Sequence, residues 1–192
     1  MPFVTFLVAL GLAVATLAVR GTEAGGIRNA LQVTARFSFL LFWCAYAGGA
    51  LGALFGSRFR TIARHTRDFG LAFASAHAVH IVLVVRLYQI SPKPPIPLSS
   101  AIFFGIALFW TYLLAVLSIR HLSRMLNPWL WRILLVVGME YIEYAFLRDF
   151  LVNPLHANAK QLIAYLPFAL LGLLGTSLRL AKWSRSTVRV AA

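Results

Sequence analysis

The chain has 192 residues, of which 60% are hydrophobic and only 12% are charged, and its mean hydropathy is +0.80. This composition excludes an ordinary soluble domain and indicates an integral membrane protein. Anionic lipid headgroups are the simplest counterion for the net charge of +13, and no basic segment is long enough to predict a nucleic-acid-binding module.

Six apolar runs are long enough to cross the roughly 30 Å of hydrocarbon in a bilayer. They predict membrane spans over residues 2–19, 37–56, 69–90, 99–119, 128–147 and 161–181. Apolar residues occupy all faces of these runs, whereas the strands of a membrane β-barrel alternate between apolar and polar residues. The predicted fold class is therefore an all-α, polytopic six-helix transmembrane bundle. Because the loops are short, we expect residues 1–192 to form one transmembrane domain.

The first two spans predict packing rather than chemistry. No small-x-small cleavage pattern follows the first span, so we expect it to be retained as a helix. Cys44 in the second span is the only cysteine and has no partner for a disulfide. Gly48 and Gly52 have the small-x-x-x-small spacing that permits a close approach between helices.

The third span contains two histidines in the stretch SAHAVHIVLVVR, residues 75–86. His77 and His80 are three positions apart, so they project from one face of a helix. Ionisable side chains at membrane depth are costly and usually face the protein interior, which makes both histidines functional candidates. They cannot both ligate one haem iron, because its axial ligands approach from opposite sides. The alternative is that both are neutral residues that form hydrogen bonds between helices.

The connections around the fourth span contain clear boundary signals. The four prolines of SPKPPIPLSS, residues 91–100, predict an extended connector between the third and fourth spans. Asn127 followed by Pro128 predicts a helix start, with asparagine as the N-cap and proline in the first turn.

The fifth span contains Glu140 and Glu143, which are again three residues apart and share a helix face. If this face meets His77 and His80, the four side chains form a His/Glu cluster of the kind that binds a transition metal. The same carboxylates are also suited to pairing with arginine or histidine, or to passing protons. We predict that all four side chains face a common interior.

Lysine and arginine are unevenly divided between the two sides of a six-span topology, with 11 on one side and 7 on the other. The side with 11 carries Arg58, Arg60, Arg64, Arg67, Arg120, Arg124, Arg132, Arg179, Lys182, Arg185 and Arg189. Basic loops are retained in the cytoplasm, so we predict that the N- and C-termini are both cytoplasmic.

Three segments resemble the ferric-reductase-like transmembrane family: TARFSFLLFWCAYAGGALG, RFRTIARHTRDFGLAFASAHAVH and FFGIALFWTYLLAVLSIRHLSRMLNPWLWR. The most specific element is Arg67, Gly70 and Leu71 followed by His77. The family includes the haem-binding membrane subunit of the methionine sulfoxide reductase system. The resemblance implies six helices in the inner membrane and a b-type haem held by histidines of the third and fifth helices, with His77 at the third-helix ligand position.

The fifth span departs from this family pattern. Trp131 stands where the first family histidine is expected, Tyr144 falls near the second, and the span contains no histidine. A haem would then need His77 or His80 with an unusual opposite ligand, and Met139 is the only thioether in this span.

These observations leave three functional interpretations open. The resemblance implies a transmembrane electron-transfer component, such as the membrane subunit of an oxidoreductase, working with a separate soluble redox partner or in a membrane complex. The loss of the fifth-span histidines favours a haem-less subunit or scaffold that keeps the fold. A metal- or proton-handling protein that uses the histidines and glutamates is the third interpretation.

Overall fold

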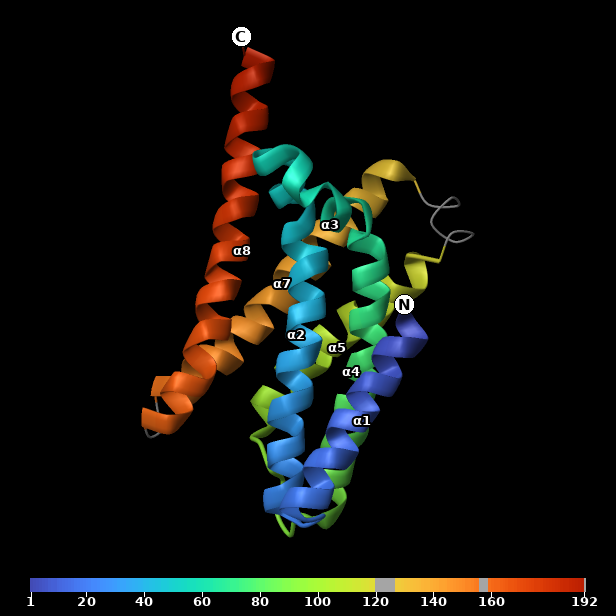
Figure 1. Cartoon of the computed structure of the whole chain (residues 1–192), viewed down its shortest axis with the longest axis vertical. Helices are drawn as coiled ribbons and strands as arrows, with labels where there is room; N and C mark the ends of the chain where they lie inside the picture. Colours follow the sequence, from blue (N-terminus) through green and yellow to red (C-terminus); the bar gives the residue numbers. More distant parts are fainter. Residues whose placement is uncertain (120–126, 156–158, 192) are drawn as a thin grey trace.

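The computed structural model describes the backbone of residues 1–119, 127–155 and 159–191, and the side chains of residues 1–119, 127–152 and 163–185. The described backbone contains long helices and no strand, which confirms the all-α prediction (Figure 1). The six long helices are α1 (Pro2–Arg20), α2 (Ala24–Phe55), α4 (Thr66–Ile90), α5 (Leu98–Leu117), α7 (Pro128–Leu155) and α8 (Ala159–Ala191). Two short helices, η1 (Gly56–Phe59) and α3 (Arg60–Arg64), join α2 to α4.

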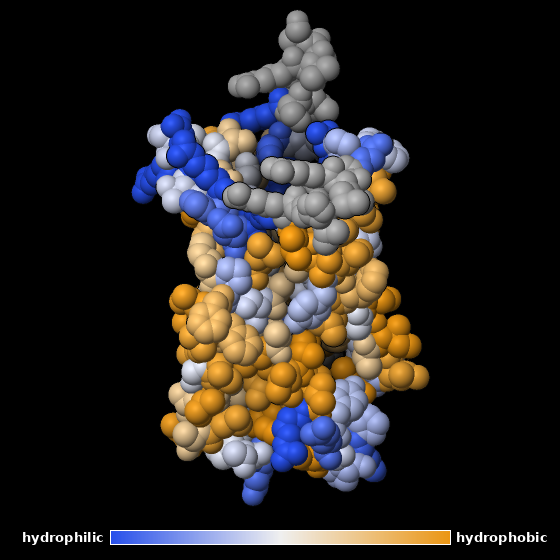
Figure 2. All heavy atoms as spheres, turned by 90° about the vertical axis from the view of Figure 1, so that its right-hand side faces the viewer, coloured by the Kyte–Doolittle hydropathy of each residue, from blue (hydrophilic) through white to orange (hydrophobic). Residues whose placement is uncertain are grey.

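Five of the long helices, α1, α2, α4, α5 and α8, are long and apolar enough to cross a membrane. Every 18-residue stretch of α7 contains at least three charged residues, which excludes this helix from that group. The space-filling view in Figure 2 shows an apolar belt between two hydrophilic ends. The chain is therefore a multi-pass membrane protein. Arg120 and Arg124, which contribute to the predicted orientation, lie outside the described residues.

Three helices extend well beyond the apolar runs that predicted them. α2 begins at Ala24, α7 continues to Leu155, and α8 continues to Ala191, beyond the rest of the bundle (Figure 1). Apolar runs report the hydrocarbon-embedded part of a helix, whereas backbone hydrogen bonding continues through polar residues at the interface. For these three helices, the predicted spans are therefore shorter than the helices themselves.

Helix α2 is the central element of the bundle. It packs against α1, α4 and α8, while α7 packs against α8 and α5. α5 approaches α4 only slightly, and α4 and α7 contact each other through aromatic side chains while their backbones stay apart. This arrangement leaves space between α4, α5 and α7.

A cluster of phenylalanines holds the middle of the bundle together. Phe39 of α2 contacts Phe150 of α7 edge-on, with the ring centroids 4.9 Å apart. Phe73 of α4 lies 5.3 Å from Phe42 of α2 and 6.0 Å from Phe146 of α7, measured between ring centroids. Aromatic pairs at these separations contribute about 0.5–1.5 kcal/mol each beyond the area that they bury. These rings connect α2, α4 and α7.

The glycine pair of α2 packs closely, as its spacing predicts. A Cβ atom at Gly48 would lie 2.8 Å from Thr66 Cγ2, and one at Gly52 would lie 2.5 Å from Ala63 Cβ. The neighbours of these glycines are thus α3 and the first turn of α4, rather than another full-length helix.

The predicted start of α7 is confirmed, because the Trp129 backbone N–H donates a hydrogen bond of 2.9 Å to Asn127 Oδ1. Asn127 therefore acts as the N-cap, and Pro128 occupies the first helical position, where a missing N–H costs nothing.

Candidate functional site

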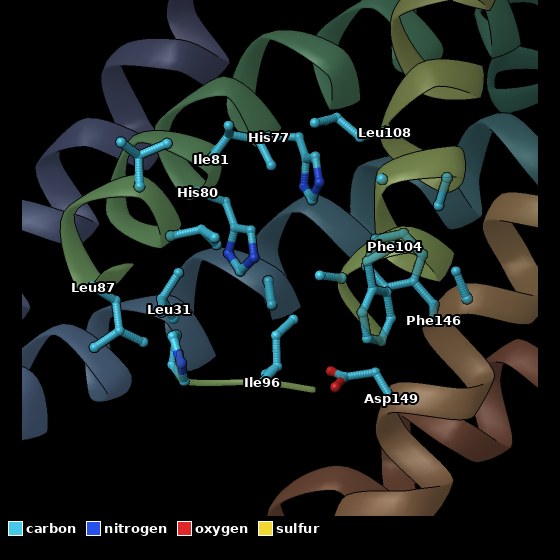
Figure 3. Close-up of a pocket in the computed structure, with 18 of the residues that line it drawn as sticks. Leu31, His77, His80, Ile81, Leu87, Ile96, Phe104, Leu108, Phe146 and Asp149 are labelled. Carbon is cyan, nitrogen blue, oxygen red and sulfur yellow. The ribbon is translucent and has the colours of Figure 1, made fainter. Parts of the chain in front are cut away.

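A cavity of about 900 Å³ occupies the space between α2, α4, α5 and α7. Figure 3 shows His77 and His80 pointing into it from α4, with Phe104 and Phe146 on the facing wall. Most of the lining is aliphatic or aromatic. Its polar and charged members include Arg28, Gln32, His77, His80, Tyr88, Gln89, Thr111, Asp149 and Tyr165. A large apolar cavity with a few polar groups is the usual form of a small-molecule or cofactor site.

The two histidines share one face of α4, as their spacing predicts. Their rings are stacked, with the centroids 5.0 Å apart and an interplanar angle of 15°. Phe73 stands on the other side of His77, at 5.3 Å between ring centroids. Both imidazoles therefore approach the cavity from the same side.

A hydrogen bond to α2 orients His80. Its Nδ1 atom lies 3.1 Å from the hydroxyl of Thr34, a fully buried residue. That hydroxyl also lies 2.9 Å from the Ala30 carbonyl and 3.2 Å from the Leu31 carbonyl, and when it donates its one hydrogen to either of them, it accepts from His80 Nδ1–H. The neutral imidazole then has its proton on Nδ1 and a free lone pair on Nε2. His80 is thus prepared to accept a hydrogen bond or to ligate a metal.

His77 lacks such support. Its Nδ1 atom is buried and has no hydrogen-bond partner among the described residues. Buried polar atoms normally have a partner, and exceptions need an explanation. The missing partner of His77 Nδ1 is compatible with a neutral imidazole that carries its one ring proton on Nε2.

Neither the two family ligand positions nor Met139 provides a second axial ligand on the facing wall of this cavity. Met139 lines a different cavity, together with Trp131. Tyr144 is 57% exposed on the outside of the bundle. The residues at the two family ligand positions and the alternative thioether therefore lie away from the histidine-lined cavity.

The second cavity has a volume of about 320 Å³ and lies toward the other end of α4. Thr66 and Arg67, at the start of α4, belong to its lining. The larger cavity instead reaches Gln89, near the end of that helix. Phe73, Thr111 and Ile142 line both cavities and form a shared wall between them.

Glu140 is part of a polar network between α7, α2 and α8. Its Oε2 accepts a hydrogen bond of 2.6 Å from the Tyr46 hydroxyl, and its Oε1 accepts one of 2.9 Å from Arg179 Nε. Arg179 also donates to the Tyr46 backbone carbonyl at 3.3 Å and lies over the Tyr46 ring, 4.4 Å from its centroid. The Glu140 side chain is 45% exposed.

Glu143 lies one turn further along α7 and is only 2% exposed. Neither of its carboxylate oxygens has a hydrogen-bond partner among the described residues. Its Oε1 is directed at Gly172 of α8, where an added Cβ would lie 2.7 Å away. The glutamates therefore face α2 and α8.

The four predicted residues occupy two separate surroundings: the histidines line the large cavity, and the glutamates lie at the contact with α8. No group of three or more His, Cys, Asp or Glu side chains that could hold a metal is found in the described part of the chain. The reason is that Arg179 and Tyr46 engage Glu140 instead. The proposed His/Glu metal cluster is not formed.

Three residues that define these surroundings were not predicted as site residues from the sequence: Thr34, Tyr46 and Arg179. Each contacts a site residue on another helix, and helical spacing reports only neighbours within one helix. The one available signal was a hydroxyl or a charge within an apolar span.

Comparison with protein-family models, curated proteins and solved structures finds no match for this chain. Its function is therefore inferred from the cavity, from the two polar surroundings and from the resemblance of its sequence segments.

Proposed function

We propose that the chain is a membrane electron-transfer component whose histidine-lined cavity binds a b-type haem through a single histidine of α4. The observation that carries this proposal is the pair of stacked imidazoles on one side of an apolar cavity of about 900 Å³. When bound, haem supplies one-electron chemistry, and the protein controls it through the axial ligand, hydrogen bonding and burial.

His80 is the better candidate for the axial ligand. A metal-bound histidine usually donates its second ring N–H to a neighbouring acceptor, which fixes the ring and raises its basicity. The Thr34 hydroxyl occupies that acceptor position at 3.1 Å from His80 Nδ1. His77, which corresponds to the ligand position of the resembling family, lacks this partner and stacks on His80.

The remaining lining supports an amphipathic, planar guest. Phe104 and Phe146 provide apolar surface opposite the histidines (Figure 3). Arg28, Gln32 and Gln89 provide donors that suit the two carboxylates of a haem. Because the residues at the two family ligand positions lie outside this cavity, His80 is the one protein ligand that we assign to the proposed iron site.

This role requires other proteins, because the sequence contains no nucleotide-binding motif. We propose a separate soluble redox partner or a membrane complex, and an inner-membrane location with both termini in the cytoplasm, which requires that α7 crosses the membrane as a sixth span. Reporter fusions at the C-terminus should indicate the cytoplasm, and an insertion at Lys93 should indicate the opposite side. A C-terminus on the outer side would contradict this orientation.

An absorption spectrum tests the haem proposal directly. Protein purified after expression with added haem should show a Soret band and sharp bands after reduction. His80→Ala should abolish them, whereas His65→Ala should not, because His65 is exposed and outside the cavity. His77→Ala should retain the bands with an altered position. Folded wild-type protein without a Soret band would refute the proposal, and loss of haem only in His77→Ala would assign the ligand to His77.

The facing wall also favours a second candidate, a haem-less membrane subunit. Aromatic rings stand where a second ligand is expected, so the cavity is also suited to a purely apolar guest such as a lipid chain. Mass spectrometry of gently purified protein distinguishes the two functions: a retained lipid without haem supports the second candidate.

A further inference from the structure

We infer that Glu143 is a proton-binding site, occupied by a proton at neutral pH, at the contact between α7 and α8. This site is separate from the histidine-lined cavity and does not rest on the proposed haem. The inference comes from the burial of the carboxyl group, the absence of partners and the distribution of nearby charges.

The burial of Glu143 is nearly complete, with 2% of the residue exposed, and neither oxygen has a hydrogen-bond partner among the described residues. An isolated carboxylate in an apolar interior carries a very large desolvation cost, and such a group neutralises instead of remaining charged. A proton converts the group into a neutral acid, which removes most of that cost.

The surrounding charges do not offer Glu143 a counterion of its own. Arg179 is the cation close enough to interact with Glu143, and its Nε already donates to Glu140 Oε1 at 2.9 Å. Glu140, on the same helix face, adds negative charge that opposes ionisation of a second carboxyl group. Tyr46 directs its hydroxyl to Glu140 at 2.6 Å. Glu140 thus has hydrogen-bond partners, whereas Glu143 has none among the described residues and carries a proton instead.

A bound metal cation is a weaker explanation. Glu143 Oε1 faces the Gly172 backbone position of α8 and neither oxygen has a hydrogen-bond partner among the described residues, whereas a hard cation needs several oxygen ligands. Gly172 leaves room for the carboxyl group, because any side chain there would collide with Oε1 and Leu147. The site of Glu143 therefore accommodates a protonated carboxyl group that has no hydrogen-bond partner among the described residues.

Infrared spectroscopy can detect this proton, because the chain has only five acidic side chains: Glu23, Asp68, Glu140, Glu143 and Asp149. A protonated carboxyl group absorbs at higher frequency than the amide backbone, and its band shifts in heavy water. Purified full-length protein in lipid nanodiscs at pH 7 should show one such band. Glu143→Gln should lose it, and the control variant Asp68→Asn should keep it, because Asp68 is exposed and paired with His65.

Each outcome of the infrared experiment either supports or overturns the inference that Glu143 carries a proton. Absence of the band from wild-type protein, or its persistence in Glu143→Gln, would overturn it, and so would its loss in Asp68→Asn. If Glu143→Gln does not fold, Glu143→Asp retains an acid with a shorter reach, and the band should then change frequency. An unchanged band in folded Glu143→Asp would assign the proton to another residue. A sodium-dependent loss of the band would indicate a cation site instead.

Discussion

Gly138 of α7 lies at the contact that holds α5 in the bundle. A Cβ atom at this position would lie 2.7 Å from Trp110 Cε3 and 2.8 Å from Leu114 Cδ1. Favourable carbon–carbon separations are about 3.5–4.0 Å. Gly138→Ala must therefore displace these side chains or α5 itself. Because α5 approaches α4 only slightly, its contact with α7 is its main support and also closes the large cavity.

A matched substitution separates the cost of this collision from the gain in helix propensity. Gly11→Ala, on the exposed face of α1, places its Cβ atom where no other atom lies within 4 Å. Both substitutions gain the same helix propensity, about 1 kcal/mol, so their difference reports the collision alone. Overpacking of this kind costs about 1–3 kcal/mol. For a chain of this size, the difference corresponds to a midpoint about 2–12 °C lower in thermal unfolding.

Thermal unfolding in one detergent, followed by circular dichroism, provides the measurement. Gly138→Ala should melt below both the wild type and Gly11→Ala. A melting temperature equal to or above that of Gly11→Ala would refute the close contact between α5 and α7.

Three further predictions concern the polar contacts. Thr34→Val keeps the side-chain volume but removes the hydroxyl that hydrogen-bonds His80 Nδ1. The free energy of unfolding should fall by about 1–3 kcal/mol in chemical unfolding, and haem should bind about 10–100-fold more weakly. An unchanged haem affinity would exclude this supporting role of Thr34. Trp43→Phe removes the 2.7 Å hydrogen bond from the indole N–H to a backbone carbonyl of α8 and should cost about 1 kcal/mol or more, visible as a lower melting temperature. A double-mutant cycle with Arg179→Gln and Glu140→Gln should give a coupling energy of about 1 kcal/mol that decreases in high salt, whereas no coupling would mean that the pair contributes nothing to stability.

Composition and local residue spacing were sufficient to predict the all-α architecture. Long apolar runs predicted the positions of the long helices, and the Asn127–Pro128 pair located the start of α7 within one residue. The three-residue spacing of His77 and His80 correctly placed both on one face. These features depend on neighbours within a few residues of each other, and such interactions can be read directly from a sequence.

The candidate site could be predicted only in part, because its geometry depends on which helices meet. Glu140 and Glu143 do share one side of α7, yet that side faces α2 and α8 rather than the histidines of α4. Nothing in the fifth span alone indicates that Arg179, far along the chain, competes for Glu140. Contacts between helices follow from the packing of the whole bundle.

The wall that the two cavities share has an electrical consequence. Phe73, Thr111 and Ile142 separate cavities that reach toward opposite ends of α4. A voltage across a membrane falls mainly over its least polarisable stretch, so water that filled both cavities would concentrate the field across these three side chains. One elementary charge moved through 100 mV exchanges about 2.3 kcal/mol with that field. With water in both cavities, a charge that crossed only this short wall would perform most of the electrical work of crossing the whole membrane.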